Sequence, residues 1–467
     1  MLLKFTSFKL AIPFFIAVAV SACQLHSVDK NVAPSLEVQP DAYLAASLGD
    51  AQAQSKDPWW ESFQRPTLNK LITQAFENNF DIKQLSLRAR QAEALIDGNK
   101  ADYFPQLSIS ASQSVQQADG GEQAETSASS LGLDWELDAF NPIGYAAQFQ
   151  RLQTLGLYED LAALRLVTSG QIAQTYFAAV AARQTLDLLE QKVKTDQRLL
   201  NLIELRLSQG VGTQVEVLQQ KARVSESSSL IPLAEARLRL EENRLSVLLG
   251  QAPKASSWVS PSETLLFNQA LPPLKVPIDL LQNRPDLRAA KARLVQADAA
   301  IGEAIANRLP RLNITAAYSQ SSDFLLSPIA SASASLFLPL LDWGKRKAQV
   351  TRNELLYQER LADFTELYIE AIAEVENASY QESRQREFIK RLELRQEILQ
   401  KTVDVTEDRF KEGVDDYLPV LSALQELRVI ERSLIEQALV LINSRIALHQ
   451  ALGGNIHFKK EEQHEPS

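Results

Sequence analysis

Apolar side chains recur at alternating intervals of three and four residues along two long stretches of the chain. In the first stretch they lie at Leu186, Leu189, Val193, Leu200, Ile203 and Leu207, with polar Asp196 in the same register. In the second they lie at Leu361, Phe364, Tyr368, Ala371, Val375 and Ala378, and the register continues through polar Glu382 and Gln385 to Phe410. A mean spacing of about 3.5 residues is typical of coiled-coil packing. Each stretch is therefore predicted to be a long helix paired with a second, antiparallel helix.

Four shorter segments alternate apolar and polar residues with a period of two, as strands with one apolar and one polar face do. They are expected at about 106–116, 129–138, 311–320 and 330–340, with loops rich in small and polar residues inside each pair. In the first segment, Leu107, Ile109 and Ala111 alternate with serines. A strand of about ten residues is long enough to cross a membrane.

The chain contains two copies of one unit. The matched segments, at offsets of 203 to 205 residues, are Asp81 to Leu107 with Asp286 to Leu312, Arg206-x-x-x-Gly210-Val211 with Arg409-x-x-x-Gly413-Val414, and Leu249-Gly250 with Leu452-Gly453. Collinear matches of this kind indicate an internal duplication. In each copy a helical stretch, Leu68 to Lys100 or Leu280 to Asn307, is expected to precede the strands.

Residues 1–22 are expected to be a lipoprotein signal peptide. Lys4 and Lys9 flank the start of an apolar segment that is too short to span a bilayer. The lipobox Val20-Ser21-Ala22-Cys23 follows and contains the single cysteine of the chain. Cleavage and acylation at Cys23 would anchor the protein to a membrane without spanning it. The alternative is an ordinary signal peptide beside a chance thiol.

The expected organisation of the mature chain follows from these features. The residue after the lipobox is Gln24 and not Asp, which favours sorting to the outer membrane. The segments expected are a lipidated extended segment at 23–58, repeat 1 at 59–270, repeat 2 at 271–453 and a polar tail at 454–467.

Composition excludes several classes of function. The chain has 48 Lys and Arg against 58 Asp and Glu, a net charge of −10, which argues against nucleic acid as a partner. One Cys and four His, without triad or metal-ligand spacing, argue against an enzyme or a metal site. Neither GxGxxG nor GxxxxGK[ST] occurs, so no cofactor and no nucleotide site is expected.

Four membrane-length strands cannot close a barrel by themselves. In hydrocarbon only closed barrels are allowed, because open edges leave backbone groups unpaired, and the usual minimum is about eight strands. The strands would therefore have to be shared between chains, with eight from two chains or twelve from three. The alternative is a small soluble sheet that caps a helical rod.

Several motifs together resemble the TolC-type outer-membrane efflux channels, in the acylated OprM/NodT-like branch that serves RND pumps. The segments that carry this resemblance are Leu280 to Ala290 (LLQNRPDLRAA), Ala300-Ile301-Gly302 with Pro310-Arg311-Leu312, Leu338 to Gly344 (LPLLDWG), and Ile231-Pro232-Leu233 with Leu248-Leu249-Gly250. Lys291 stands where the family usually has Glu. The motifs are collinear with the family over nearly all of the mature chain.

The resemblance implies a mainly α protein with a transmembrane β part. Three chains would form a homotrimer with a 12-stranded β-barrel and a 12-helix periplasmic tunnel. The implied partners are a periplasmic adaptor protein, an inner-membrane RND pump and outer-membrane lipid. The family also breaks one long helix at an equatorial belt, which accounts for Pro232, a residue that is costly inside a helix.

The two Arg-x-x-x-Gly turns lie at the far end of the predicted coiled coils. In the family this motif docks the helical hairpin of the adaptor, and the residues that match it here are Arg206, Gly210, Val211, Arg409, Gly413 and Val414. Glycine suits the left-handed backbone conformation that often ends a helix, and arginine can donate to carbonyls or carboxylates of a partner. The alternative is that the arginines only cap the last carbonyls of their own helices.

The same end of the molecule is expected to close the tunnel. Relatives often carry Asp at the position of Ser422, so the expected acidic ring is absent there. Leu418 is a candidate for an apolar constriction, and Asp415, Asp416 and Glu216 are candidates for negative charge. The alternative for these acids is a solvated helix N-terminus, where carboxylates are favoured.

The sequence therefore predicts the outer-membrane channel of a tripartite efflux pump, a passive and gated duct for drugs or other toxic small molecules. One alternative is an exit duct for type I protein secretion, which would share the fold and differ in its partner. Another is a structural coiled-coil lipoprotein of the envelope, which would have no membrane strands and no conductance.

Overall fold

The computed structural model describes residues 26–36, 40–45, 58–117, 123–265, 271–272, 274, 276–321 and 328–454. The predicted signal peptide, Cys23 and nearly all of the predicted tail lie outside the described residues. The elements of the first half are η2 (Trp59–Phe63), α2 (Pro66–Asn78), α3 (Phe80–Ala101), β1 (Gln106–Gln117), β2 (Gln123–Leu137), α4 (Pro142–Ser208), α5 (Gln214–Ser229) and α6 (Ile231–Leu248). Those of the second half are η3 (Pro277–Asp279), α7 (Leu280–Asn283), α8 (Pro285–Ala306), β3 (Arg311–Ser321), β4 (Ile329–Phe337), α9 (Lys345–Lys411) and α10 (Tyr417–Ala451).

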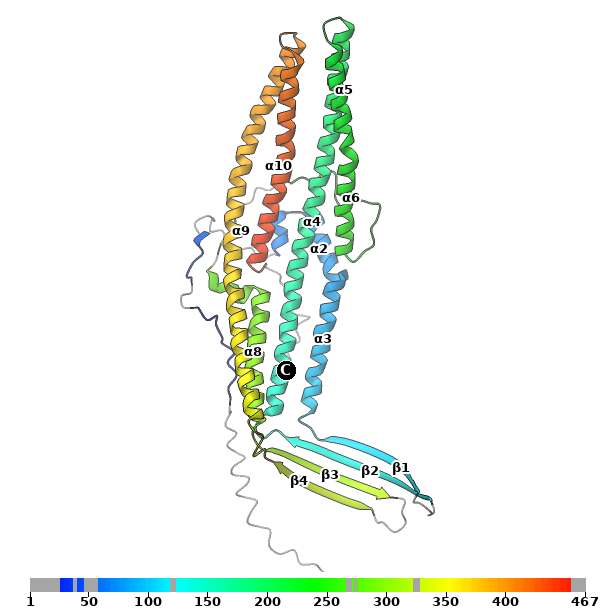
Figure 1. Ribbon diagram of the computed structural model, residues 1–467, viewed down its shortest axis with the longest axis vertical. Helices are drawn as coiled ribbons and strands as arrows, with labels where there is room; N and C mark the ends of the chain where they lie inside the picture. The colour runs from blue at the N-terminus through cyan, green and yellow to red at the C-terminus, as the bar shows by residue number, and fades with distance from the viewer. Residues whose placement is uncertain are drawn as a thin grey trace, which may run out of the picture.

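The molecule is long, with the strands at one end and the helix tips at the other (Figure 1). The two long helices predicted from the heptad pattern are α4 and α9, each of 67 residues. At about 1.5 Å per residue each extends about 100 Å. No described helix is both long and apolar enough to cross a membrane.

The returning helices differ between the repeats. In repeat 1 the helix breaks at Leu230 into α5 and α6, and Pro232 lies in the first turn of α6, where its missing N–H costs little. In repeat 2, α10 runs unbroken for 35 residues. The break predicted from Pro232 is therefore present.

The four strands form one antiparallel sheet in the order β1-β2-β3-β4. The second predicted strand is present, but its predicted start was wrong, because β2 begins at Gln123 and occupies much of the segment expected to be a loop. Gln123 pairs with Gln117, since backbone groups form the ladder even where no apolar alternation marks a strand. The fourth strand ends at Phe337, short of the predicted 340, and Pro339 just beyond it has no N–H to donate.

Two predicted helical stretches are each broken once, at equivalent positions. Asn79 separates α2 from α3, and Arg284 separates α7 from α8. Both side chains donate to the carbonyl at the end of the returning helix: Asn79 Nδ2 lies 2.9 Å from Leu248 O, and Arg284 Nη1 lies 3.2 Å from Ala451 O. The duplication is thus visible in side-chain contacts as well as in element order.

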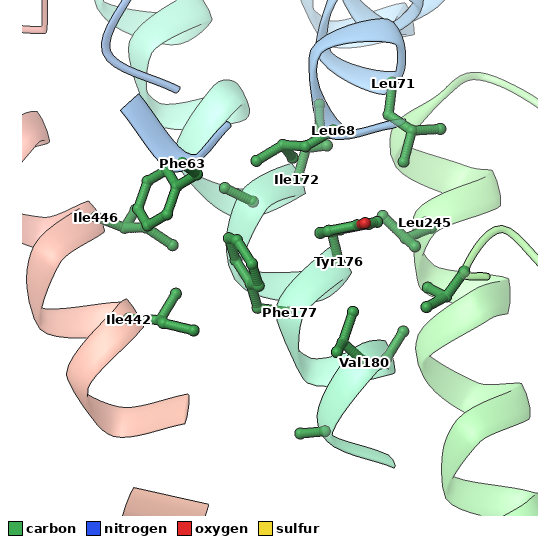
Figure 2. Packing of buried hydrophobic residues seen from close by; sticks show 14 of the residues in the cluster. Phe63, Leu68, Leu71, Ile172, Tyr176, Phe177, Val180, Leu245, Ile442 and Ile446 are labelled. Atoms are coloured by element: carbon green, nitrogen blue, oxygen red, sulfur yellow. The ribbon is translucent and has the colours of Figure 1, made fainter. Parts of the chain in front are cut away.

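The largest apolar core lies near the middle of the molecule. Figure 2 shows side chains of η2, α2, α4, α6 and α10 meeting there, with Phe63, Tyr176, Phe177, Leu245 and Ile446 among them. Burial of this apolar surface is the main favourable contribution to stability. A separate apolar core holds the helices together near the tips.

Candidate docking site and aperture at the helix tips

The two turns at the tips have the same backbone geometry. Gly210 and Gly413 both have φ of 75°. Val211 N donates to Arg206 O at 3.0 Å, and Val414 N donates to Arg409 O at 2.9 Å, so each turn ends its helix with a Schellman-type bond. A Cβ added to either glycine would meet no atom within 4 Å. The left-handed backbone therefore requires glycine here, while the surface outside it is open.

The two motif arginines make different contacts. Arg409 forms a bidentate ion pair within its own turn, with Nε 2.6 Å and Nη2 2.9 Å from the carboxylate of Asp415. This ion pair lowers the pKa of Asp415 below its usual value. Residue 212, the counterpart of Asp415 in repeat 1, is glycine. Arg206 therefore has no such carboxylate, and its Nη1 donates to Phe410 O of the other tip at 2.6 Å.

Apolar side chains surround the turns on the surface. Val211 is 64% exposed, Val414 60% and Leu418 65%. Exposed apolar side chains that lie together are candidates for contact with a partner.

The structure separates the aperture candidates into two groups. Leu418 and Ser422, one turn apart on α10, are both exposed, and Asp416 is exposed at the start of the same helix. Asp415 is engaged by Arg409. Glu216 forms a capping box with Thr213, in which its Oε2 accepts from Thr213 N at 2.9 Å. Glu216 therefore caps α5, as the alternative interpretation of this acid expected.

A buried polar network lies between the tips and the middle of the molecule, and it was not predicted. Asp196 of α4 is 2% exposed and its carboxylate pairs with Arg428 of α10. Ser227 Oγ of α5 donates to the same carboxylate at 2.7 Å, and Gln220 Nε2 donates to Asp196 O at 2.8 Å. The network therefore joins three helices from both repeats.

Two further groups extend this network. The Tyr417 hydroxyl bonds to the Gln220 side-chain oxygen, and burial raises the pKa of Tyr417 to about 12. Lys192 Nζ donates to Arg428 O at 3.2 Å, and burial lowers the pKa of Lys192 to about 8.

The one signal of this network in the sequence was Asp196, a carboxylate in an apolar heptad position. Its partners lie 24 to 232 residues away along the chain, so no local pattern indicated them.

The described chain nearest to Cys23 is bound to the helices next to the sheet. His26 Nε2 lies 2.6 Å from Asp298 Oδ1 of α8, and Asp29 N donates to the same carboxylate at 2.8 Å. Tyr145 of α4 donates from its hydroxyl to His26 O at 2.5 Å. The segment that follows Cys23 is thus attached at the sheet end of the helices.

Comparison with known proteins gives relatives over nearly the whole chain. The model of the family described as outer membrane efflux protein matches residues 71–251 and 276–454. The pyoverdine export outer membrane protein OpmQ of Pseudomonas putida is 28% identical, over 90% of this chain and 93% of its own. The solvent efflux pump outer membrane protein SrpC of Pseudomonas putida is 27% identical, over 95% and 98%. The cation efflux system protein CusC of Escherichia coli K12 is 25% identical, also over 95% and 98%.

Solved structures share the fold. The outer-membrane channel OprN superposes with a TM-score of 0.82 at 24% identity, over 92% of this chain and 99% of its own. The open state of the MtrE outer membrane channel of Neisseria gonorrhoeae superposes with a TM-score of 0.80 at 20% identity, over 92% and 98%. The two family matches coincide with the two repeats, and they cover well over half of the chain. The chain therefore belongs to the outer membrane efflux protein family, and it is an efflux channel of the outer membrane of a Gram-negative bacterium.

Proposed function

We propose that three copies of this chain form a passive, gated duct, with a shared 12-stranded barrel and a 12-helix tunnel. The observation that carries this proposal is the isolated four-stranded sheet at one end of the long helices. Within the described chain, β1 and β4 each pair on one side only. Open edges are not tolerated in a bilayer, and pairing β4 of one chain with β1 of the next would remove them.

The two faces of the sheet support a barrel wall. On the apolar face, large side chains are exposed in the single chain: Leu107 at 68%, Ile109 at 82% and Tyr318 at 48%. On the opposite face, hydroxyls bond across strands, with Ser110 Oγ 2.8 Å from Ser130 Oγ and Thr315 Oγ1 2.7 Å from Ser333 Oγ. Apolar outside and polar inside is the pattern of outer-membrane barrels.

The tips are the proposed docking site for a periplasmic adaptor. Gly210 and Gly413 leave the backbone open to close approach, and exposed Val211 and Val414 offer apolar contact. Arg206 and Arg409 supply donors suited to carbonyls or carboxylates of the partner. An inner-membrane RND pump would load the duct through this adaptor.

The proposed aperture is a ring of Leu418 from three chains, with Ser422 one turn further from the tip. Among the three candidate acids Asp415, Asp416 and Glu216, only Asp416 is exposed, so it is the proposed source of negative charge at the tunnel mouth. The buried network around Asp196 holds α4, α5 and α10 together in this state. A tip with two arrangements, biased by the adaptor, provides gating without an energy source in the duct.

The proposed cargo is a small toxic compound or drug. The relatives are named for pyoverdine export, solvent efflux and cation efflux, and solvents and cations are small solutes.

We also propose that Cys23 carries the lipid anchor. Cys23→Ser should abolish lipid labelling and weaken membrane attachment while leaving the fold intact, and unchanged labelling would contradict the anchor.

The test of the duct is the native mass of the full-length protein extracted in detergent, followed by conductance in planar bilayers. One precursor chain has a mass of 52.0 kDa, so a trimer is expected near 150 kDa. A monomer that is stable without detergent would contradict the shared barrel. Co-isolation with an ABC exporter in place of an RND pump would contradict the proposed partner and favour the protein-secretion alternative.

A further inference from the structure

One motif arginine connects the two tips of the protomer. Arg206, at the end of α4, donates from Nη1 to Phe410 O, at the end of α9, at 2.6 Å. Its guanidinium also lies over the Phe410 ring, 4.4 Å from the ring centroid. Phe410 is 1% exposed, so this contact is partly desolvated and stronger than a surface contact. Arg409, the counterpart in repeat 2, binds within its own turn.

The contact continues into the buried network. The rings of Phe410 and Tyr417 lie 5.9 Å apart. The Tyr417 hydroxyl bonds to Gln220, and Gln220 donates to the Asp196 carbonyl at 2.8 Å. A continuous series of contacts therefore runs from a docking-motif arginine to the ion pair that joins α4 and α10. Coupling between sites requires a physical connection of this kind.

Arg206 is not fully satisfied where it lies. Its Nε is buried and has no hydrogen-bond acceptor among the described residues. A carboxylate can accept two parallel bonds from a guanidinium, and such a pair is stronger than a bond to one carbonyl. A partner carboxylate at the tip would therefore compete well for this side chain.

We propose that Arg206 is a positioning residue that holds the two tips of each protomer together in the resting channel. This inference rests on the docking and duct functions proposed above. An adaptor that binds Arg206 withdraws it from Phe410 and thereby loosens the contact between α4 and α9. Docking and opening then depend on the same side chain.

The test is the open probability of full-length channels in planar bilayers without adaptor. Arg206→Ala removes one charge-assisted bond in each protomer and is expected to raise the open probability about tenfold or more. The matched control is Arg198→Ala, because Arg198 lies two turns earlier on α4 and donates to Lys194 and Thr195 of the same helix. This control is expected to behave as the wild type.

A second variant keeps the test valid if Arg206→Ala channels do not assemble. Phe410→Leu places the repeat 1 residue, as in Leu207, at this position and removes the ring under the guanidinium. It is expected to raise the open probability by a smaller factor. Wild-type open probability in assembled Arg206→Ala channels would overturn the proposal, even if these channels no longer respond to an adaptor. Wild-type channels that do not conduct even with the adaptor bound would overturn the duct itself.

Discussion

At the residue scale, the unusual feature is charge inside the coiled coils. Glu382 of α9 is fully buried, and its two oxygens lie 2.7 Å from Nε and 2.5 Å from Nη2 of Arg445 on α10. Arg386 donates to the same carboxylate at 2.8 Å. The heptad pattern revealed Glu382 as a polar interruption, but Arg445 lies 63 residues away and no local pattern pointed to it.

Removing this carboxylate is expected to destabilise the protein strongly. Glu382→Ala removes the carboxylate that pairs with the buried Arg445 guanidinium, and losses of this kind cost about 3–5 kcal/mol. The measurement is urea denaturation followed by circular dichroism. Glu387→Ala is the control, because Glu387 forms its ion pairs on the surface, and its midpoint should stay near that of the wild type. Equal midpoints for the two variants would contradict the prediction.

His449 is expected to make stability depend on pH. Burial, helped by nearby Arg445, lowers the pKa of His449 to about 3, whereas an unfolded imidazole titrates near 6.5. Between these values the unfolded state binds more protons. The contribution is therefore complete above about pH 6.5 and is lost as the pH falls towards 3, by up to about 1.4 kcal/mol per pH unit.

The variant that tests this is His449→Phe, which keeps a ring against Trp59, the stacked neighbour of His449. Its free energy of unfolding should fall less than that of the wild type between about pH 7 and pH 5. The measurement is urea denaturation at both pH values. Parallel changes in the two proteins would show that His449 does not titrate on unfolding.

At the element scale, each repeat closes with the same joint. The returning helix ends in a glycine with positive φ, 67° at Gly250 and 88° at Gly453. A Cβ there would lie 2.3 Å from Asn78 O or 2.6 Å from Asn283 O, the carbonyls that precede the two helix breaks. The sequence contained the Leu-Gly pair and its repetition. Why glycine is needed became clear only from the backbone that approaches it.

Gly453→Ala should therefore weaken the joint. The left-handed backbone and the approach of Asn283 O both oppose a side chain, and a cost of about 1–3 kcal/mol is expected. Gly98→Ala is the control, since Gly98 lies inside α3 with no atom within 4 Å of an added Cβ. That change should stabilise by about 0.5–1 kcal/mol. The measurement is urea denaturation of both variants. A free energy of unfolding of Gly453→Ala equal to that of the wild type would contradict the prediction.

At the scale of the whole molecule, the sheet is the part that the single chain leaves incomplete. Ile109 pairs with Leu131 on the apolar face, while Ser110 pairs with Ser130 on the other. Ile109 and Ser110 are both exposed in one chain. Only the assembly and the membrane give the two faces different surroundings.

Ile109→Arg and Ser110→Arg should therefore behave differently. An arginine on the lipid face of an outer-membrane barrel costs about 2–4 kcal/mol at the midplane, whereas a residue facing the lumen meets water. Ile109→Arg should reduce the amount of trimer recovered from the outer membrane, and Ser110→Arg should not. The measurement is trimer abundance in fractionated membranes. Equal losses would mean that the faces are not distinguished by lipid.

The sequence by itself determined the duplication, the long helices, the strand faces and the tip turns. Periodicity, the repeated Arg-x-x-x-Gly motif and glycine at the turns can each be recognised within short stretches of sequence. The tertiary structure alone decided the early start of β2, since backbone pairing needs no side-chain signal. It also decided that Arg409 binds Asp415 while Arg206 reaches Phe410. The Arg206–Phe410 contact joins residues 204 positions apart, and its energy depends on geometry that no local pattern contains.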